Sequence, residues 1–500
     1  VGYEANKQFY KGNQITRATF LFETPEYYTL ATGTGTPIVV PGGTQANSNS
    51  LVSAFASANY SYKDKYLLTA TVRKDETSRF SPENQGKLFT SASIGWVIDK
   101  ESFFNSSFID NLKLRASYGE LGNQDLPASN PDVNISGLNE DQSFYSFTGA
   151  RGSATPGAIL LSVGNQNLTW ETSVSTNIGL DFGLLSGRIR GSIEYFDIST
   201  KDLIVRDNSL IGSTAIDAGA PFVNFGEVNN KGVDFDIVYA DEMDSGFNYE
   251  VAFNLSSYKN TVVSLVGDNP ITGDSYYRGG AVTRSEVGQP ISTFYGRQVT
   301  GIHQTGALAG RLQYADIDGV AGINDSDRTV IGSPHPDFTY GININMEYKN
   351  FDLMMFWNGS QGNDIYNYSK IFTDFPTFFN GNRSTRVLDA WTAANGSNTQ
   401  PALSESITNS ETQPNSFFVE DGSYLRLKTL QIGYTFSDVK IKDAGVDSIR
   451  LYLSGANLLT FTDYDGLDPE VAGNNALTIG VDEGTYPLPQ ITTVGLNINF

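Results

Sequence analysis

The C-terminal stretch Gln490-Ile-Thr-Thr-Val-Gly-Leu-Asn-Ile-Asn-Phe500 alternates between apolar and polar residues. Val494, Leu496 and Ile498 share one parity with the terminal phenylalanine, whereas glycine and asparagine occupy the other. A period of two is typical of a β-strand with one apolar face and one polar face. A strand of a soluble β-sandwich and a strand of an outer-membrane β-barrel both fit this pattern. The rest of the chain must decide what the apolar face contacts.

The composition narrows the class of protein. No window approaches about 18 consecutive apolar residues, so no transmembrane helix is predicted. The chain contains no cysteine, so neither disulfides nor thiolate metal sites are expected. Its formal charge of −22 disfavours nucleic acid as a partner, because a phosphate-binding face needs clustered Lys and Arg. No nucleophile elbow, phosphate-binding loop or dinucleotide fingerprint occurs, so we predict no catalytic residue and no enzymatic activity.

Alternating stretches continue along the chain from Leu51 onwards. They predict about fourteen strands and no long helix, hence an all-β fold. The parity changes near Thr429 within 424–436, which predicts a β-bulge. Residues 1–50 are polar and Gly-rich, and their one candidate strand lies near Ile15–Glu23.

The connections between these strands alternate between short and long. The short ones lie near 63–64, 99–110, 183–186, 242–246, 349–350 and 437–446, and the notable long ones are 122–167, 260–336, 363–422 and 458–487. Outer-membrane barrels have short periplasmic turns and long extracellular loops. The polar parity also carries charges of both signs, such as Arg115, Asp181 and Glu194, which suit a wet lumen. We therefore predict a transmembrane antiparallel β-barrel whose C-terminus lies at the periplasmic end.

Several separate stretches resemble one known family. They are Tyr60–Arg73 (YSYKDKYLLTATVR), Ser78–Ser81 (SRFS), Leu112–Gly119 (LKLRASYG), Asn167–Thr172 (NLTWET), Asn224–Val233 (NFGEVNNKGV), Tyr424–Lys428 (YLRLK), Ser454–Thr462 (SGANLLTFT), Gly466–Glu470 (GLDPE) and Tyr486–Pro489 (YPLP). In this order they resemble the barrel of SusC/RagA-type TonB-dependent transporters of the Bacteroidetes outer membrane. The resemblance runs from about residue 50 to the C-terminus.

The resemblance implies a longer protein than this chain. The family begins with a carboxypeptidase-regulatory-like β-domain, a TonB box and a plug domain, and none of these is recognised in the sequence. A barrel of this kind closes at about 22 strands. We therefore expect the C-terminal part of a transporter, with residues 1–50 as a barrel strand and an extracellular loop and 51–500 as the rest of this barrel portion.

The function that the resemblance implies is TonB-dependent import of an oligosaccharide or oligopeptide across the outer membrane of a Gram-negative bacterium. The implied partners are a SusD-like surface lipoprotein, the TonB–ExbB–ExbD complex acting through the N-terminal part, the barrel-assembly machinery and outer-membrane lipid. Two alternatives stay open: a passive porin or structural or adhesive barrel, and a soluble β-sandwich that binds or hydrolyses glycans.

Three sets of residues are candidate sites. Aromatic side chains in 363–422 could line a substrate vestibule or could pack on neighbouring loops or a partner lipoprotein; they are Tyr366, Tyr368, Phe372, Phe378, Phe379 and Trp391. Asp316, Asp318, Asp325 and Asp327 form an acidic run that could hold Ca²⁺, although the twelve-residue loop spacing ending in Glu is absent. No other cofactor is expected. Phe500 resembles the C-terminal aromatic residue that the barrel-assembly machinery reads.

Overall fold

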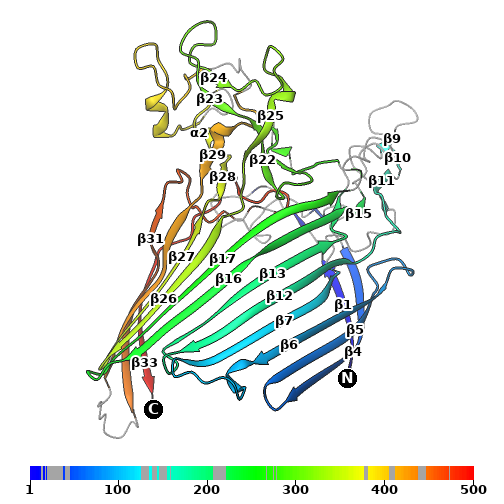
Figure 1. The fold of residues 1–500 in the computed structure, drawn as a ribbon. Helices are drawn as coiled ribbons and strands as arrows, with labels where there is room; N and C mark the ends of the chain where they lie inside the picture. The colour runs from blue at the N-terminus through cyan, green and yellow to red at the C-terminus, as the bar shows by residue number, and fades with distance from the viewer. Residues whose placement is uncertain are drawn as a thin grey trace.

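One antiparallel sheet of fourteen strands dominates the computed structural model (Figure 1). Its strands, in order across the sheet, are β1 (Gly2–Gly12), β4 (Gln45–Tyr62), β5 (Tyr66–Thr77), β6 (Gly86–Val97), β7 (Ile109–Asn123), β12 (Glu171–Leu184), β13 (Ile189–Lys201), β16 (Gly226–Glu242), β17 (Phe247–Leu265), β26 (Phe338–Tyr348), β27 (Phe351–Gln361), β30 (Tyr424–Phe436), β31 (Ser448–Thr462) and β33 (Ile491–Asn499). The predicted number of strands is confirmed. Within the described residues, β1 and β33 are the two edges of the sheet.

The structure describes residues 1–12, 15–16, 19, 38–39, 45–124, 135–137, 144–145, 155–157, 159–206, 221–265, 267, 269–273, 275–276, 279–376, 381–404, 411–436, 446–471, 473 and 475–499. No helix in these ranges is long and apolar enough to cross a membrane.

The two faces of the sheet follow the predicted parities. Ile344 of β26 lies opposite Val251 of β17 on one side and Met355 of β27 on the other. Similar apolar rows cross the remaining strands, and many of their side chains are exposed, including Leu68, Ile94, Ile178, Ile193, Leu453 and Val494. Because opposite residues of antiparallel strands point to the same side, these rows form one continuous apolar outer face. The other parity forms a polar face, which we call the lumen face.

Short turns join the strands at one end of the sheet, and both termini lie at that end (Figure 1). In the Tyr62–Lys65 turn, Lys63 and Asp64 have φ of 54° and 52°, which is the backbone of a type I′ turn. Aromatic rings gather near the same end: Tyr239 contacts Tyr249, and Phe351 contacts Tyr434 with ring centroids 4.6 Å apart. This arrangement fits an aromatic girdle at the membrane interface.

Glu101 fixes one of these turns. Its carboxylate accepts hydrogen bonds from Lys65 Nζ (3.0 Å), Tyr66 Oη (2.6 Å) and Trp96 Nε1 (3.2 Å). The bond from Tyr66, followed by those from Lys65 and Trp96, lowers the pKa of Glu101 from its ordinary 4.5 to about 2. The charged carboxylate therefore stabilises the junction of β5, β6 and the 3-10 turn Ile98–Lys100.

Acid should weaken this junction selectively. A carboxylate with a depressed pKa stabilises the folded state above its ordinary pKa, and this contribution is lost as the pH falls through the folded value. We expect hydrogen exchange of amides in 97–104 to rise, after correction for intrinsic rates, as the pH falls below 4.5 towards 2. Glu101→Gln should flatten that pH dependence. Identical profiles for the variant and the parent would refute the role of Glu101.

The first barrel strand differs from the prediction. As far as the chain is described, the strand expected near Ile15–Glu23 is not part of the wall: Ile15–Thr16 forms only the short β2, and 17–18 and 20–23 lie outside the described residues. The barrel strand is β1, which pairs with β4. The alternation in β1 is obscured because Lys7 and Lys11 share the parity of Tyr3 and Phe9. The predicted bulge is confirmed, since the register of β30 shifts between Leu427 and Thr429 against both neighbours.

At the other end of the sheet, three of the long connections fold together (Figure 1). We call the part they form, residues 271–332, 364–421 and 464–485, the extracellular subdomain. It contains β18 (Ile271–Thr272), β19 (Ser275–Tyr276), β20 (Gly280–Ala281), β21 (Thr283–Ser285), β22 (Thr293–Arg297), β23 (Val299–Ile302), β24 (Leu312–Tyr314), β25 (Arg328–Gly332), β28 (Asp364–Asn367), β29 (Val419–Asp421), β32 (Val481–Asp482), α2 (Lys370–Thr373) and the 3-10 turns Asp325–Asp327, Thr385–Asp389 and Ser416–Phe418. Phe294, Tyr366 and Phe418 meet at its buried core.

Smaller hairpins lie at the same end of the sheet as the extracellular subdomain. They pair β2 with β3 (Ile38–Val39), β8 (Ile135–Gly137) with β11 (Ile159–Ser162), β9 (Phe144–Tyr145) with β10 (Thr155–Pro156), and β14 (Ile204–Arg206) with β15 (Phe222–Asn224). The long connections thus lie at the end opposite the short turns, as predicted.

Candidate functional site

Ion pairs cross the lumen face between neighbouring strands. Arg115 Nη2 lies 2.5 Å from Glu194 Oε2, and its Nε lies 3.0 Å from Asp181 Oδ1. The other oxygen of Asp181, Oδ2, lies 3.3 Å from Lys113 Nζ. Further along the wall, Arg450 pairs with Asp352. Partly exposed pairs of this kind contribute only about 0–1 kcal/mol each. Together they give the lumen face charges of both signs, as the sequence pattern predicts.

The candidate vestibule aromatics lie inside the extracellular subdomain. Tyr366 and Tyr368 are each only 2% exposed, and Phe372 and Trp391 pack against the same core. Phe378 and Phe379 lie outside the described residues. The rings of Tyr366 and Tyr368 are covered by protein and pack on neighbouring loops, whereas Phe372 and Trp391 are only partly buried. A substrate contact by any of the six stays a prediction.

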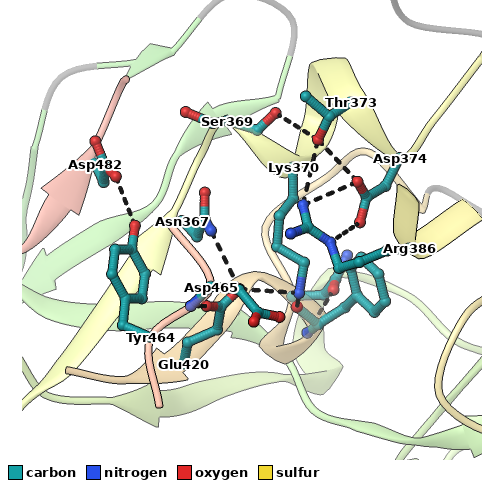
Figure 2. A network of polar contacts seen from close by, with 12 residues as sticks. Asn367, Ser369, Lys370, Thr373, Asp374, Arg386, Glu420, Tyr464, Asp465 and Asp482 are labelled. Atoms are coloured by element: carbon teal, nitrogen blue, oxygen red, sulfur yellow. Dashed lines mark hydrogen bonds and ion pairs between the residues drawn. The ribbon is translucent and has the colours of Figure 1, made fainter. Parts of the chain in front are cut away.

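A buried polar network joins two of the three connections of the subdomain, 364–421 and 464–485 (Figure 2). Lys370 Nζ lies 3.1 Å from Glu420 Oε1 and donates to the carbonyl of Phe417 at 2.9 Å. The Glu420 carboxylate also accepts from Asn367 Nδ2 and from the backbone N–H of Asp465. Figure 2 shows that these groups come from α2, β28, β29 and the segment after β31. Partners from distant parts of the chain therefore satisfy each buried charge, which fixes how the connections pack.

Tyr464 forms a second tie in this network. Its hydroxyl donates to Asp482 Oδ2 at 2.6 Å, while Asp482 Oδ1 accepts from the N–H groups of Gly484 and Thr485 (Figure 2). Burial, together with the hydrogen bond to Asp482, raises the pKa of Tyr464 well above its ordinary value. The phenol therefore stays a neutral donor throughout the physiological range.

Tyr464→Phe should loosen the extracellular subdomain by about 1 to 2 kcal/mol, because a buried carboxylate loses its only side-chain donor among the described contacts. We expect faster proteolysis and hydrogen exchange in 464–485, with the barrel wall unchanged. Tyr486→Phe is the matched control, since Tyr486 is 88% exposed. Equal effects of the two variants would show that the Tyr464 hydroxyl contributes nothing.

The acidic loop brings together three of its four predicted residues. Carboxylate oxygens of Asp316, Asp318 and Asp327 lie within 4.8 Å of one another, whereas Asp325 pairs with Arg297 at 3.2 Å. Backbone N–H groups of Asn324, Ile317 and Asp318 donate to Asp327 and lower its pKa. These donors account for the close approach of the carboxylates. Ca²⁺ binding stays a prediction, with Asp316, Asp318 and Asp327 as the residues that would hold the ion.

Several of the family-like stretches contact one another. Phe80 of the SRFS stretch and Phe89 both pack on Trp170 of NLTWET, with ring centroids 5.5 Å apart. Arg426 of YLRLK binds Asp468 of GLDPE, where Nη2 and Oδ1 are 2.6 Å apart. These pairings were not predicted, because the sequence gives the motifs but not their partners. Phe500 lies outside the described residues, and the rest of its strand, β33, pairs with β31.

Comparisons with known proteins agree with this architecture. The family model "TonB dependent receptor-like, beta-barrel" matches residues 2–458. TonB-dependent receptor P3 of Formosa agariphila is 34% identical over 524 residues, covering 100% of this chain and 50% of that protein. TonB-dependent receptor SusC of Bacteroides thetaiotaomicron is 28% identical over 470 residues, covering 91% of this chain and 44% of SusC.

A solved structure shares the fold. The structure of the RagAB peptide transporter matches with a TM-score of 0.81 and 22% identity, covering 100% of this chain and 53% of the matched chain. The chain spans about half the length of the relatives that it matches.

Proposed function

The chain belongs to the TonB-dependent receptor-like β-barrel family, and from this we propose that it forms part of the wall and the outer surface of an active nutrient importer. It is an outer-membrane protein of the SusC/RagA type, as the family model and the relatives indicate. The family consists of receptors and transporters, so the expectation that the chain is not an enzyme is confirmed. The observation that carries the proposal is the family match over residues 2–458.

We propose that import runs by conformational change, without bond chemistry. The energy would come from the TonB–ExbB–ExbD complex, which would act through the N-terminal part of the longer protein. The apolar outer face suits contact with lipid, and the ion-paired lumen face suits a hydrated path. Both support transport through the barrel, and an oligosaccharide or an oligopeptide would fit such a path.

A SusD-like lipoprotein is the proposed partner at the outer surface. The similarity to SusC and to the RagAB transporter supports it. The extracellular subdomain also exposes apolar side chains on the acidic loop, namely Ile317, Val320 and Ile323. Exposed apolar groups of this kind are common where proteins bind one another.

A soluble β-sandwich differs from an active importer in its fold, and a passive porin differs from it in energy dependence. A soluble β-sandwich needs two packed sheets, whereas the described strands of the wall form one continuous sheet whose outer face is apolar. A passive porin would use the same wall, so only energy dependence separates it from an importer.

The test is uptake by cells that make the whole protein, with and without functional TonB. Fluorescently labelled oligopeptide and maltooligosaccharide mixtures serve as probes. We expect uptake of one mixture that is lost without TonB. Uptake that persists without TonB would establish a passive pore and overturn the proposal. Co-purification of a surface lipoprotein from the same cells tests the proposed partner.

A further inference from the structure

A cavity of about 370 Å³ lies where the wall meets the extracellular subdomain. One side of it is a cross-strand row formed by Thr200 of β13, Val228 of β16 and Val262 of β17. Val228 shares the parity of the charged residues Asp234 and Asp236, so this row belongs to the lumen face. The cavity therefore opens on the inner side of the wall, at its extracellular end.

The lining of this cavity is unlike the rest of the lumen face. Its residues are mainly aliphatic and come from both the wall and the subdomain: Leu203, Ile204, Leu265, Ile271, Ile291 and Leu477. An apolar cavity is unfavourable in a water-filled lumen, because the water inside it contacts apolar surface. The composition and volume are those of a ligand pocket, which is commonly apolar with a few polar groups.

The buried polar groups of the lining are already bonded to the protein. Asn260 Nδ2 donates to Asn230 Oδ1 at 2.7 Å, and Asn260 Oδ1 accepts from the N–H of Ile291 at 2.8 Å. Ser285 Oγ accepts from the N–H of Ser292. These groups therefore offer few partners to the several hydroxyls of a sugar ring, and burying unpaired hydroxyls is costly. Among the described residues of the lining, the one aromatic side chain is Phe225, which is itself buried and offers no open ring face.

Glu171 supplies the polar end of the cavity. Its carboxylate accepts from the N–H of Ile204 and from Asn123 Nδ2, both at 3.2 Å. Among the described residues, no Lys or Arg is ion-paired with it. Each carboxylate oxygen has a second lone pair, so Glu171 can accept from a further N–H donor.

We propose that this cavity binds an apolar side chain of an oligopeptide, with Glu171 accepting from a neighbouring peptide N–H or amine. The inference rests on the proposed import function and selects the oligopeptide from its two substrate classes. An aliphatic pocket beside a carboxylate matches an apolar side chain flanked by N–H donors. It does not match a chain of hydroxyl-bearing rings.

The experiment uses the full-length transporter in lipid nanodiscs and isothermal titration with three probes: Gly-Gly-Leu-Gly-Gly, Gly-Gly-Ser-Gly-Gly and maltopentaose. We expect the Leu peptide to bind at least about tenfold more tightly than the Ser peptide, as burial of one aliphatic side chain predicts. Maltopentaose should not compete. Ala476→Phe, which fills the cavity, should remove the preference for Leu.

Ala252→Phe is the matched control, because it places the same side chain on the lumen face outside the cavity. It should keep the preference. Leu477→Ala, which enlarges the cavity, should move the preference from Leu towards Phe in Gly-Gly-Phe-Gly-Gly, a readout that an unfolded variant cannot give.

Equal binding of the Leu and Ser peptides by the parent would overturn the inference, and so would an Ala476→Phe variant that keeps the preference. A segment of the longer protein that fills the cavity would give the first of these outcomes. Neither outcome touches TonB-dependent uptake, which fails or succeeds separately and tests the import function itself.

Discussion

Arg426→Ala is expected to destabilise the protein by about 3 to 5 kcal/mol, because it leaves a buried carboxylate without its cation. Arg426 is 4% exposed along its side chain and Asp468 is 6% exposed, and their charged atoms are 2.6 Å apart. Burial opposes the charge on Asp468, but the hydrogen bond from Arg426, those from the N–H groups of Glu470 and Leu488, and the charge of Arg426 together outweigh it and lower the pKa of Asp468. Glu470, 3.3 Å from the same guanidinium, would lose part of its compensation as well.

The measurement is urea unfolding of the full-length protein in lipid, followed by electrophoretic mobility of the folded barrel. Arg190→Ala is the control, since Arg190 pairs with Glu250 at 2.6 Å but its side chain is 53% exposed. The control should cost no more than about 1 kcal/mol. If both variants lose the same free energy of unfolding, burial does not explain the contribution of the Arg426–Asp468 pair.

Ile344→Arg should impair assembly by about 2 to 4 kcal/mol, the cost of an arginine on the lipid face at mid-bilayer depth. The apolar row of Val251, Ile344 and Met355 fixes this side chain on the outer face. The amount of folded protein in the outer membrane is the readout.

Asn345→Arg is the neighbouring control. Asn345 lies opposite Glu250 on the lumen face, where an added cation meets water and a carboxylate. We expect near-normal amounts of folded protein. Equal tolerance of the two arginines would contradict the assignment of the faces.

The wall could be predicted from the sequence because its rules are local. Alternation with a period of two identified the strands, and the change of parity near Thr429 identified the bulge. Alternation did not identify β1, because Lys7 and Lys11 occupy the same parity as Tyr3 and Phe9. Local patterning cannot identify this strand because both of its faces carry polar residues.

The extracellular subdomain could not be predicted in the same way. Phe294 comes from one connection and Tyr366 and Phe418 from distant parts of another, yet the three meet in one core, and no short-range periodicity encodes such contacts. An aromatic-rich loop has the same composition whether its rings bind a ligand or pack together. Similarly, the spacing of the acidic run could not show that Asp327 turns inward to backbone donors while Asp325 turns to Arg297.

The pairing of β32 with β28 has a consequence for the order of assembly. These strands are parallel, Tyr366 lies beside Val481, and Val481 belongs to the shared core. Contacts between residues so far apart in the chain form slowly, because a long loop must close first. The core is complete only when Val481 has crossed the membrane, so the extracellular subdomain should mature last. A fully formed outer surface would then report that the chain has been exported at least as far as Val481.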